Sequence, residues 1–168
     1  PQVPVAKAVP TIRYQASPRP FVADLCVGAL AALPDRLLAT TVGEGVEKLV
    51  EIGSDGQVQA LGIQLPARPD EICLLALSPG KHDGFQEGEA LVSIGAEIWR
   101  VQLGPRTATY FASLPGADVT VAGLCFDTVG DFGFAPLVLA SSGTVYRLDP
   151  AGALLRVGDV GAGGRGPS

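Results

Sequence analysis

The sequence predicts an all-β protein of three tandem repeats, each folded as a four-stranded antiparallel sheet. Short runs rich in Val, Leu, Phe and Tyr recur along the chain, and their length is typical of β-strands. Breaks that contain glycine or proline separate these runs, as in strands joined by tight turns. The whole pattern returns at a spacing of about fifty residues, which indicates a repeat architecture.

The third repeat shows the pattern most clearly. Its predicted strands cover residues 121–127, 136–142, 144–149 and 153–159. The breaks between these strands contain Gly130, Gly143 and Gly152, and glycine accepts the positive φ angles that tight turns require. This repeat is therefore the template for aligning the other two.

The two earlier repeats follow the template in weaker form. The second repeat has predicted strands at 70–76, 90–95, 97–101 and 108–114. The first repeat has predicted strands at 23–29, 37–42, 48–52 and 58–65. One series of markers places a large or branched side chain at the same position of each repeat, namely Val50, Trp99 and Tyr146.

The cysteines form a second series of markers, because Cys26, Cys73 and Cys125 also align in the three repeats. Their wide spacing excludes a CxxC zinc or redox motif. Equivalent positions in successive repeats lie too far apart for a disulfide, since the two Cα atoms must come within about 7 Å. We therefore expect all three cysteines to be small buried residues that fill the space between repeats.

A period of this length with four strands per unit is typical of a β-propeller blade. Propellers close with about four to eight blades around an axis. Three blades leave two apolar end faces, and three solutions remain open. The chain is half of a six-bladed β-propeller that a second copy completes, or part of a longer protein, or a compact three-sheet prism.

The segment 123–152 reads GLCFDTVGDFGFAPLVLASSGTVYRLDPAG, and this repeat resembles those of bacterial exported β-propeller proteins of the NHL and gluconolactonase-like kind. The resemblance covers residues 21–160 and concerns the repeats, which identify a scaffold and not an activity. It implies a six-bladed propeller and an extracellular or periplasmic location. Because the sequence opens at Pro1, we expect that a leader or an initiator has been removed before Pro1, or that the chain is a fragment. The resemblance also implies that calcium is a possible cofactor in a central channel.

The repeats divide the chain into an arm, a β domain and a tail. Residues 1–20 hold five of the fourteen prolines and are expected to form an extended N-terminal arm that clasps a blade or a neighbouring subunit. The three-repeat domain covers 21–160. Its blades are expected at about 21–66, 67–115 and 116–160, and the glycine-rich segment 161–168 is expected to be a flexible tail.

The composition limits the partners that the protein can have. Hydrophobic residues make up 47% of the chain, charged residues only 17%, and the mean hydropathy is +0.33. No apolar run reaches the roughly 18–20 residues of a membrane span. The net charge of −5 argues against nucleic acid and anionic membranes, which attract basic surfaces. The high apolarity instead predicts faces buried against a second copy or another protein chain, as in a homodimer or a larger assembly.

The absence of Met and Asn fits a thermostable protein or a GC-rich genome.

Few residues are candidates for chemistry. His82 is the only histidine, which excludes a multi-histidine metal site within one chain, and with Asp83 it is either an exposed loop residue or part of a binding rim. Asp127 and Asp131 flank a turn, where they bond the backbone or, as the resemblance implies, bind calcium.

Arg100 and Arg147 share a repeat position. We expect them to be solvated partners of nearby acids such as Glu97 and Asp149, or a pair that binds a carboxylate. The sequence has no phosphate-binding loop, no Gly-x-Ser-x-Gly motif and no paired-carboxylate motif, so the catalytic residues are unknown and no metal ligands are assigned.

Two functions follow from these observations. The first is a non-enzymatic structural or interaction module without a cofactor, which assembles through its apolar end faces. The alternative, which only the resemblance implies, is a calcium-dependent small-molecule hydrolase of the lactonase type. The absence of Asn and of a recurring inward acid departs from the calcium sites of that family.

Overall fold

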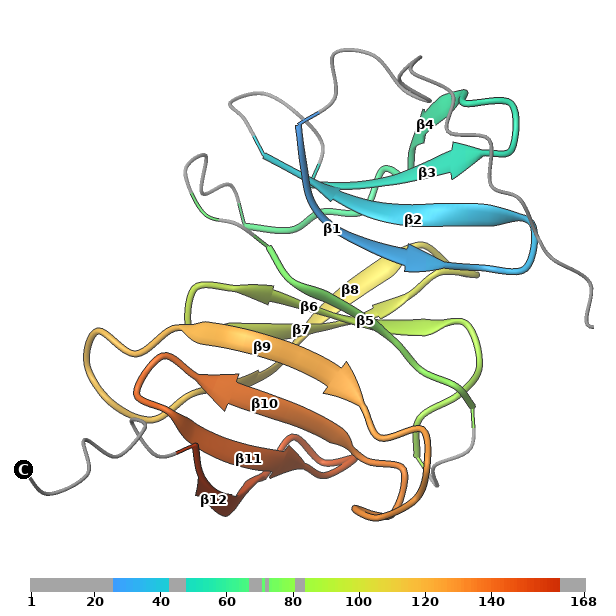
Figure 1. Cartoon of the computed structure of the whole chain (residues 1–168). Helices are drawn as coiled ribbons and strands as arrows, with labels where there is room; N and C mark the ends of the chain where they lie inside the picture. Colours follow the sequence, from blue (N-terminus) through green and yellow to red (C-terminus); the bar gives the residue numbers. More distant parts are fainter. Residues whose placement is uncertain (1–25, 43–47, 67–70, 72, 81–83, 161–168) are drawn as a thin grey trace, which may run out of the picture.

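The computed structural model describes residues 26–42, 48–66, 71, 73–80 and 84–160, and these residues form strands and connections without a helix (Figure 1). The first sheet contains β1 (Val27–Ala32), β2 (Arg36–Thr41), β3 (Leu49–Gly53) and β4 (Val58–Ala60). The second contains β5 (Leu75–Leu77), β6 (Glu89–Ile94), β7 (Glu97–Gln102) and β8 (Thr107–Ser113). The third contains β9 (Val121–Phe126), β10 (Pro136–Ala140), β11 (Thr144–Leu148) and β12 (Leu154–Asp159). The predicted fold class of three four-stranded antiparallel repeats is confirmed.

Each sheet is a meander in which neighbouring strands pair antiparallel in chain order. The first strands of successive sheets lie together, because β1 contacts β5 and β5 contacts β9. Figure 1 shows β4 near one end of the molecule and β12 near the other. The three sheets are thus arranged like neighbouring propeller blades, with their first strands on the inside.

The strand registers confirm the alignment of the large-residue markers. Val50 pairs with Ala39 on β2, Trp99 pairs with Val92 on β6, and Tyr146 pairs with Val138 on β10. Each of these β2, β6 and β10 residues in turn pairs with a leucine on the first strand of its sheet, which is Leu30, Leu75 or Leu124. At this position, the residues on the first three strands of each sheet are therefore equivalent in all three repeats.

The alignment of the cysteines is wrong. Cys125 pairs with Leu137 on β10, and the residues at that position in the other two sheets are Ala76 and Ala31. Cys73 lies before β5 and Cys26 before β1. The expected burial also holds for only one of the three, since Cys73 is buried while Cys26 and Cys125 are exposed.

The middle sheet is covered on both faces. We call the face that a sheet directs toward the next sheet along the chain its leading face, and the opposite face its trailing face. All residues of β6 are buried, and their side chains alternate between the two faces. A strand buried on both sides needs apolar residues at successive positions, which explains the run Ala90–Val92.

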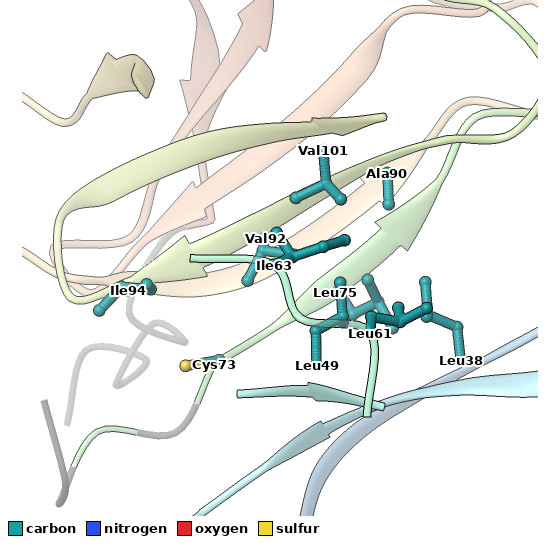
Figure 2. Packing of buried hydrophobic residues seen from close by; sticks show 10 residues of the cluster. All are labelled: Leu38, Leu49, Leu61, Ile63, Cys73, Leu75, Ala90, Val92, Ile94 and Val101. Atoms are coloured by element: carbon teal, nitrogen blue, oxygen red, sulfur yellow. The ribbon is translucent and has the colours of Figure 1, made fainter. Parts of the chain in front are cut away.

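Two clusters join the three sheets. In the first cluster, Leu38 and Leu49 on the leading face of the first sheet pack with Val92 and Val101 on the trailing face of the second (Figure 2). The second cluster joins the second sheet to the third. Its buried members are Ala76, Phe85, Leu91, Ile98, Ala112, Leu114, Phe126, Val138, Ala140 and Leu148. The second sheet thus packs on the first in the same way as the third sheet packs on the second.

The observed strand bounds differ from the predicted ones mainly at the first strand of the first two repeats. β1 runs from Val27 to Ala32, where 23–29 was expected, and β5 runs from Leu75 to Leu77, where 70–76 was expected. β4 ends at Ala60, although 58–65 was expected. Leu61 and Ile63 lie beyond β4 and belong to the first cluster, so their apolar character reflects packing between sheets and not a longer strand.

The turn between β11 and β12 fits closely against the second sheet. Gly152 has a φ of +88°, and a Cβ atom there would collide with the carbonyl oxygen of Phe111 on β8. Gly84 has a φ of +92°, and its Cβ would lie 2.5 Å from the Cβ of Pro150. Both glycines therefore allow a backbone approach that any side chain would prevent.

The described residues contain no helix that is long and apolar enough to cross a membrane. The predicted arm at 1–20 and the predicted tail at 161–168 lie outside the described residues.

Candidate functional site

Arg100 is the centre of a polar and aromatic cluster on the second sheet. One terminal nitrogen of its guanidinium, Nη2, donates to Oε2 of Glu89 at 2.7 Å and to the carbonyl oxygen of Gly84 at 2.6 Å. The guanidinium carbon lies 5.0 Å from the ring centre of Phe85 and 5.6 Å from that of Phe111. Cations are attracted to aromatic faces at such distances, so Arg100 is held by charge and by ring contacts together.

Glu89 is the buried anion of this cluster. Burial opposes its ionisation, but hydrogen bonds from Arg100, from the backbone N–H of Gln86 and from Gln102 outweigh burial and hold the pKa of Glu89 below its ordinary value. The expectation that Arg100 is a solvated partner of Glu97 is therefore wrong. Its partner is Glu89, and the pair is largely removed from solvent, with side chains 6% and 20% exposed for Glu89 and Arg100.

The first sheet carries an ion pair at the same two repeat positions. Nε of Arg36 donates to Oε1 of Glu51 at 2.9 Å. Register places Arg36 at the position of Glu89, and Glu51 at the position of Arg100. The order of the charges is thus reversed between the two sheets.

The third sheet lacks this pair. Arg147 pairs with Leu137 in the register, as Arg100 pairs with Leu91, so the predicted equivalence of the two arginines is confirmed. The position of Glu89 is occupied by Ala135. Within the part of the chain that the structure describes, the Arg147 side chain forms no ion pair or hydrogen bond, and Asp149 does not pair with it. Instead, Oδ1 of Asp149 accepts hydrogen bonds from the backbone of the following turn.

Arg147 lies within an apolar surface, the leading face of the third sheet. Register places the following residues on it around Arg147: Cys125, Leu137, Leu139, Val145 and Leu155. Leu155 is 57% exposed, and Leu137 is half-buried. The equivalent of Leu137 on the second sheet is Leu91, which is 1% exposed because the third sheet covers it. The third sheet therefore presents to solvent a face that the repeat elsewhere buries.

Asp127 organises the loop between β9 and β10. Its Oδ1 accepts hydrogen bonds from the backbone N–H groups of Val129 and Gly130, each at 3.0 Å. Its Oδ2 accepts from those of Phe132, at 2.8 Å, and Phe134, at 3.1 Å. Burial of Asp127 opposes ionisation, but these four donors outweigh it and hold the pKa below its ordinary value of 3.8.

The other predicted site residues do not join a site. Asp131 is exposed in the loop that Asp127 organises. His82 and Asp83 lie outside the described residues. No group of three or more His, Cys, Asp or Glu side chains that could hold a metal ion occurs in the described ranges.

An open pocket of about 510 Å³ lies between the first and second sheets. Arg36, Glu89 and Gln102 line it. The charges of Arg36 and Glu89 are already engaged in the two ion pairs. Among the charged lining residues, this leaves only the exposed carboxylate of Glu87 without an ion pair in the described part of the chain.

The partner of Arg100 was missed in the sequence because Glu89 precedes its predicted strand at 90–95. The sequence does contain a signal for this position, because a charged residue directly precedes the second predicted strand in both repeats. This residue is Arg36 before 37–42 and Glu89 before 90–95. Phe85 was missed for a different reason. It belongs to a connection, and the connections do not follow the repeat.

Comparisons with known proteins bear on the fold alone. No protein-family model matches the chain, and no curated protein matches it. The chain is similar to the crystal structure of the computationally designed Ika4 protein, with a TM-score of 0.53 and 16% identity, over 83% of this chain and 79% of that one. It is also similar to the computationally designed Ika8 protein, with a TM-score of 0.50 and 16% identity, over 77% of this chain and 35% of that one. Together with the three stacked sheets, these likenesses support a propeller-like repeat fold.

Proposed function

We propose that the chain is a non-enzymatic structural and interaction module that docks a further protein through the leading face of its third sheet. The observation that carries the proposal is the exposure of this face. The leading faces of the first two sheets are covered by the next sheet, whereas Leu155 and Cys125 of the third are exposed. Exposed apolar faces of this kind are typical of interaction sites.

The stacking of the sheets indicates how a partner would fit. The second sheet contributes Leu91 and Ile98 to the cluster that the third sheet covers. The third sheet has Leu137 and Val145 at the same positions, so its leading face suits a partner sheet stacked in the same way. The area removed from water would stabilise such a complex at about 25 cal/mol per Å² before the costs of association.

The test compares the wild-type chain with the Leu155→Glu variant in native mass spectrometry and in the binding of a fluorescent apolar dye. The wild type is expected either to form a complex or to bind the dye as a monomer. A charge at the exposed Leu155 should dissociate the complex or lower dye binding, because an unpaired charge is costly within a buried apolar interface.

The matched control is Val129→Glu, which places the same charge on an exposed apolar residue outside the sheet faces. This variant should behave like the wild type. A monomeric wild type without dye binding, or equal effects of both substitutions, would contradict the proposal.

Several finer points are proposals that rest on the sequence alone. A homodimer in which two chains complete a six-bladed ring is the alternative to docking of a different protein, and the native mass of the purified chain distinguishes the two. Export to the periplasm or the cell exterior follows from the repeat resemblance, and cell fractionation measures it. The thermostability expected from composition is tested by thermal unfolding.

The alternative of a calcium-dependent hydrolase also rests on the repeat resemblance. We keep it second because both Asp127 oxygens accept backbone hydrogen bonds, which leaves this carboxylate engaged in its own loop. A rise in the melting temperature on adding calcium, reversed by a chelator, would favour the hydrolase over the interaction module.

A further inference from the structure

We propose that the protein docked on the leading face of the third sheet is not a second copy of this chain, and that it presents a carboxylate to Arg147. This inference rests on the proposed function. It adds that the partner is a different protein and that its docking surface carries a negative charge.

The repeat shows what the position of Arg147 requires. In the first sheet this position holds Glu51, which pairs with Arg36. In the second sheet it holds Arg100, which pairs with Glu89. In both cases a charge on a leading face, next to the following sheet, is neutralised by a side chain of its own sheet.

Arg147 has no such partner in its own sheet. Ala135 stands where the neutralising residue would be, and its methyl group carries no charge. Among the residues that the structure describes, nothing else pairs with the guanidinium. In the chain without a partner, the half-buried Arg147 side chain still contacts water. A sheet stacked on Leu137 and Leu155 would remove that water.

A docked partner must therefore supply the missing anion. Enclosing an unpaired guanidinium is strongly unfavourable, whereas a carboxylate can accept two parallel hydrogen bonds from it. Complementary charge at a single point within an apolar interface also fixes the register of the partner. Arg147 thus selects, among apolar sheets, those with an acidic residue facing it.

Within the described residues, neither of the two sheet faces on which a second copy would stack meets this requirement. The trailing face of its first sheet carries Leu30, Ala39 and Val50, which have no charge, and Ala39 and Val50 are already buried. The leading face of its third sheet would bring two Arg147 side chains into one interface, and like charges there are unfavourable. A different protein with an apolar face and one carboxylate fits the surface better.

The experiment uses the full chain with Arg147→Lys, added to an extract of the cells that produce the protein and treated with a carbodiimide. This reagent joins an amine to a carboxylate only when the two are in contact, and the products are mapped by mass spectrometry. The matched control is Arg156→Lys, because Arg156 is an exposed residue of the same sheet that pairs with Tyr146 in the register, and so belongs to the trailing face.

The expected result is a cross-link from position 147 to an Asp or Glu of one other protein. Position 156 should give only an internal link to Asp159, which is the ion-pair partner of Arg156. Arg147→Glu should lower the amount of that protein retained on the chain by on the order of tenfold or more, since a like charge would then face its carboxylate. The inference is overturned if position 147 links only to another copy of this chain, or if it gives no product.

Leu155→Glu separates the two proposals. If this variant loses a protein that the wild type binds, while position 147 gives no cross-link, the proposed docking surface is supported and the proposed carboxylate of the partner is rejected. If neither the wild type nor the variant retains any protein or binds the apolar dye, the proposed function fails as well.

Discussion

Arg36 on β2 and Glu89 on β6 occupy the same position of the repeat but carry opposite charges. Each forms an ion pair with the residue at a second shared position, so the first two repeats share the pairing of charges but not their order. What differs is burial, because the Arg36 side chain is 39% exposed while that of Glu89 is 6% exposed. Two equivalent ion pairs in one molecule thus allow a matched test of how burial changes their energetic contribution.

Glu89→Gln is expected to lower the free energy of unfolding by about 3–5 kcal/mol, because it leaves the largely buried Arg100 without its anion. The matched variant Glu51→Gln should cost at most about 1 kcal/mol, since Arg36 can turn to solvent. Denaturant unfolding of both variants measures the two losses. Equal losses would mean that burial does not distinguish the pairs.

Asp127→Asn is expected to make stability less dependent on pH in acid. The pKa of Asp127 is lowered by folding, so its ionised form stabilises the protein above the ordinary carboxyl pKa, and this contribution is lost as the pH falls through the folded value. The variant should therefore unfold more easily than the wild type at pH 7, and the gap should narrow in acid. Thermal unfolding across pH measures this. Asp131→Asn, in the same loop but exposed, should leave the melting temperature unchanged. A difference in melting temperature between Asp127→Asn and the wild type that stays constant with pH would argue against the role of Asp127.

Leu148→Ala is expected to cost about 2–5 kcal/mol of unfolding free energy, since Leu148 is fully buried between the second and third sheets. Leu155→Ala, on the exposed leading face of the same sheet, should change stability by no more than about 0.5 kcal/mol. Chemical denaturation compares the two. A large loss for Leu155→Ala would show that this face is already covered within the chain.

Gly152→Ala is expected to destabilise the contact between the second and third sheets. An alanine would need a positive φ, and its methyl group would meet the carbonyl oxygen of Phe111. A melting temperature lower by several degrees is the expected result, at about 4 °C or less per kcal/mol for a chain of this size. Gly104→Ala is the control, because a Cβ there meets no atom within 4 Å. Similar melting temperatures for both variants would contradict the close approach.

A thiol reagent is expected to modify two cysteines of the native protein rapidly and one slowly. Burial raises the pKa of the Cys73 thiol, which lowers the fraction of reactive thiolate, while Cys26 and Cys125 are exposed. Mass mapping of the modified residues over time measures the order. Rapid labelling of Cys73 in the folded chain would contradict its burial between the first two sheets.

The sequence by itself determined the strands and their order. Alternating apolar residues and turn glycines are local signals, and a meander pairs neighbouring strands, so the registers that align Trp99 with Tyr146 follow from local pattern. The cysteine alignment failed because a small residue fits many positions, and only strand pairing shows that Ala76 and not Cys73 corresponds to Cys125.

The tertiary structure decided which faces are covered and which charges are paired. Leu91 and Leu137 have the same side chain at the same repeat position, but only the stacking of sheets buries the first and leaves the second half-exposed. The partner of Arg100 was likewise set by a diagonal contact between β6 and β7, and its aromatic neighbour Phe85 by a connection outside the repeat. Burial and ion pairing depend on residues far apart in the chain, which a local pattern does not specify.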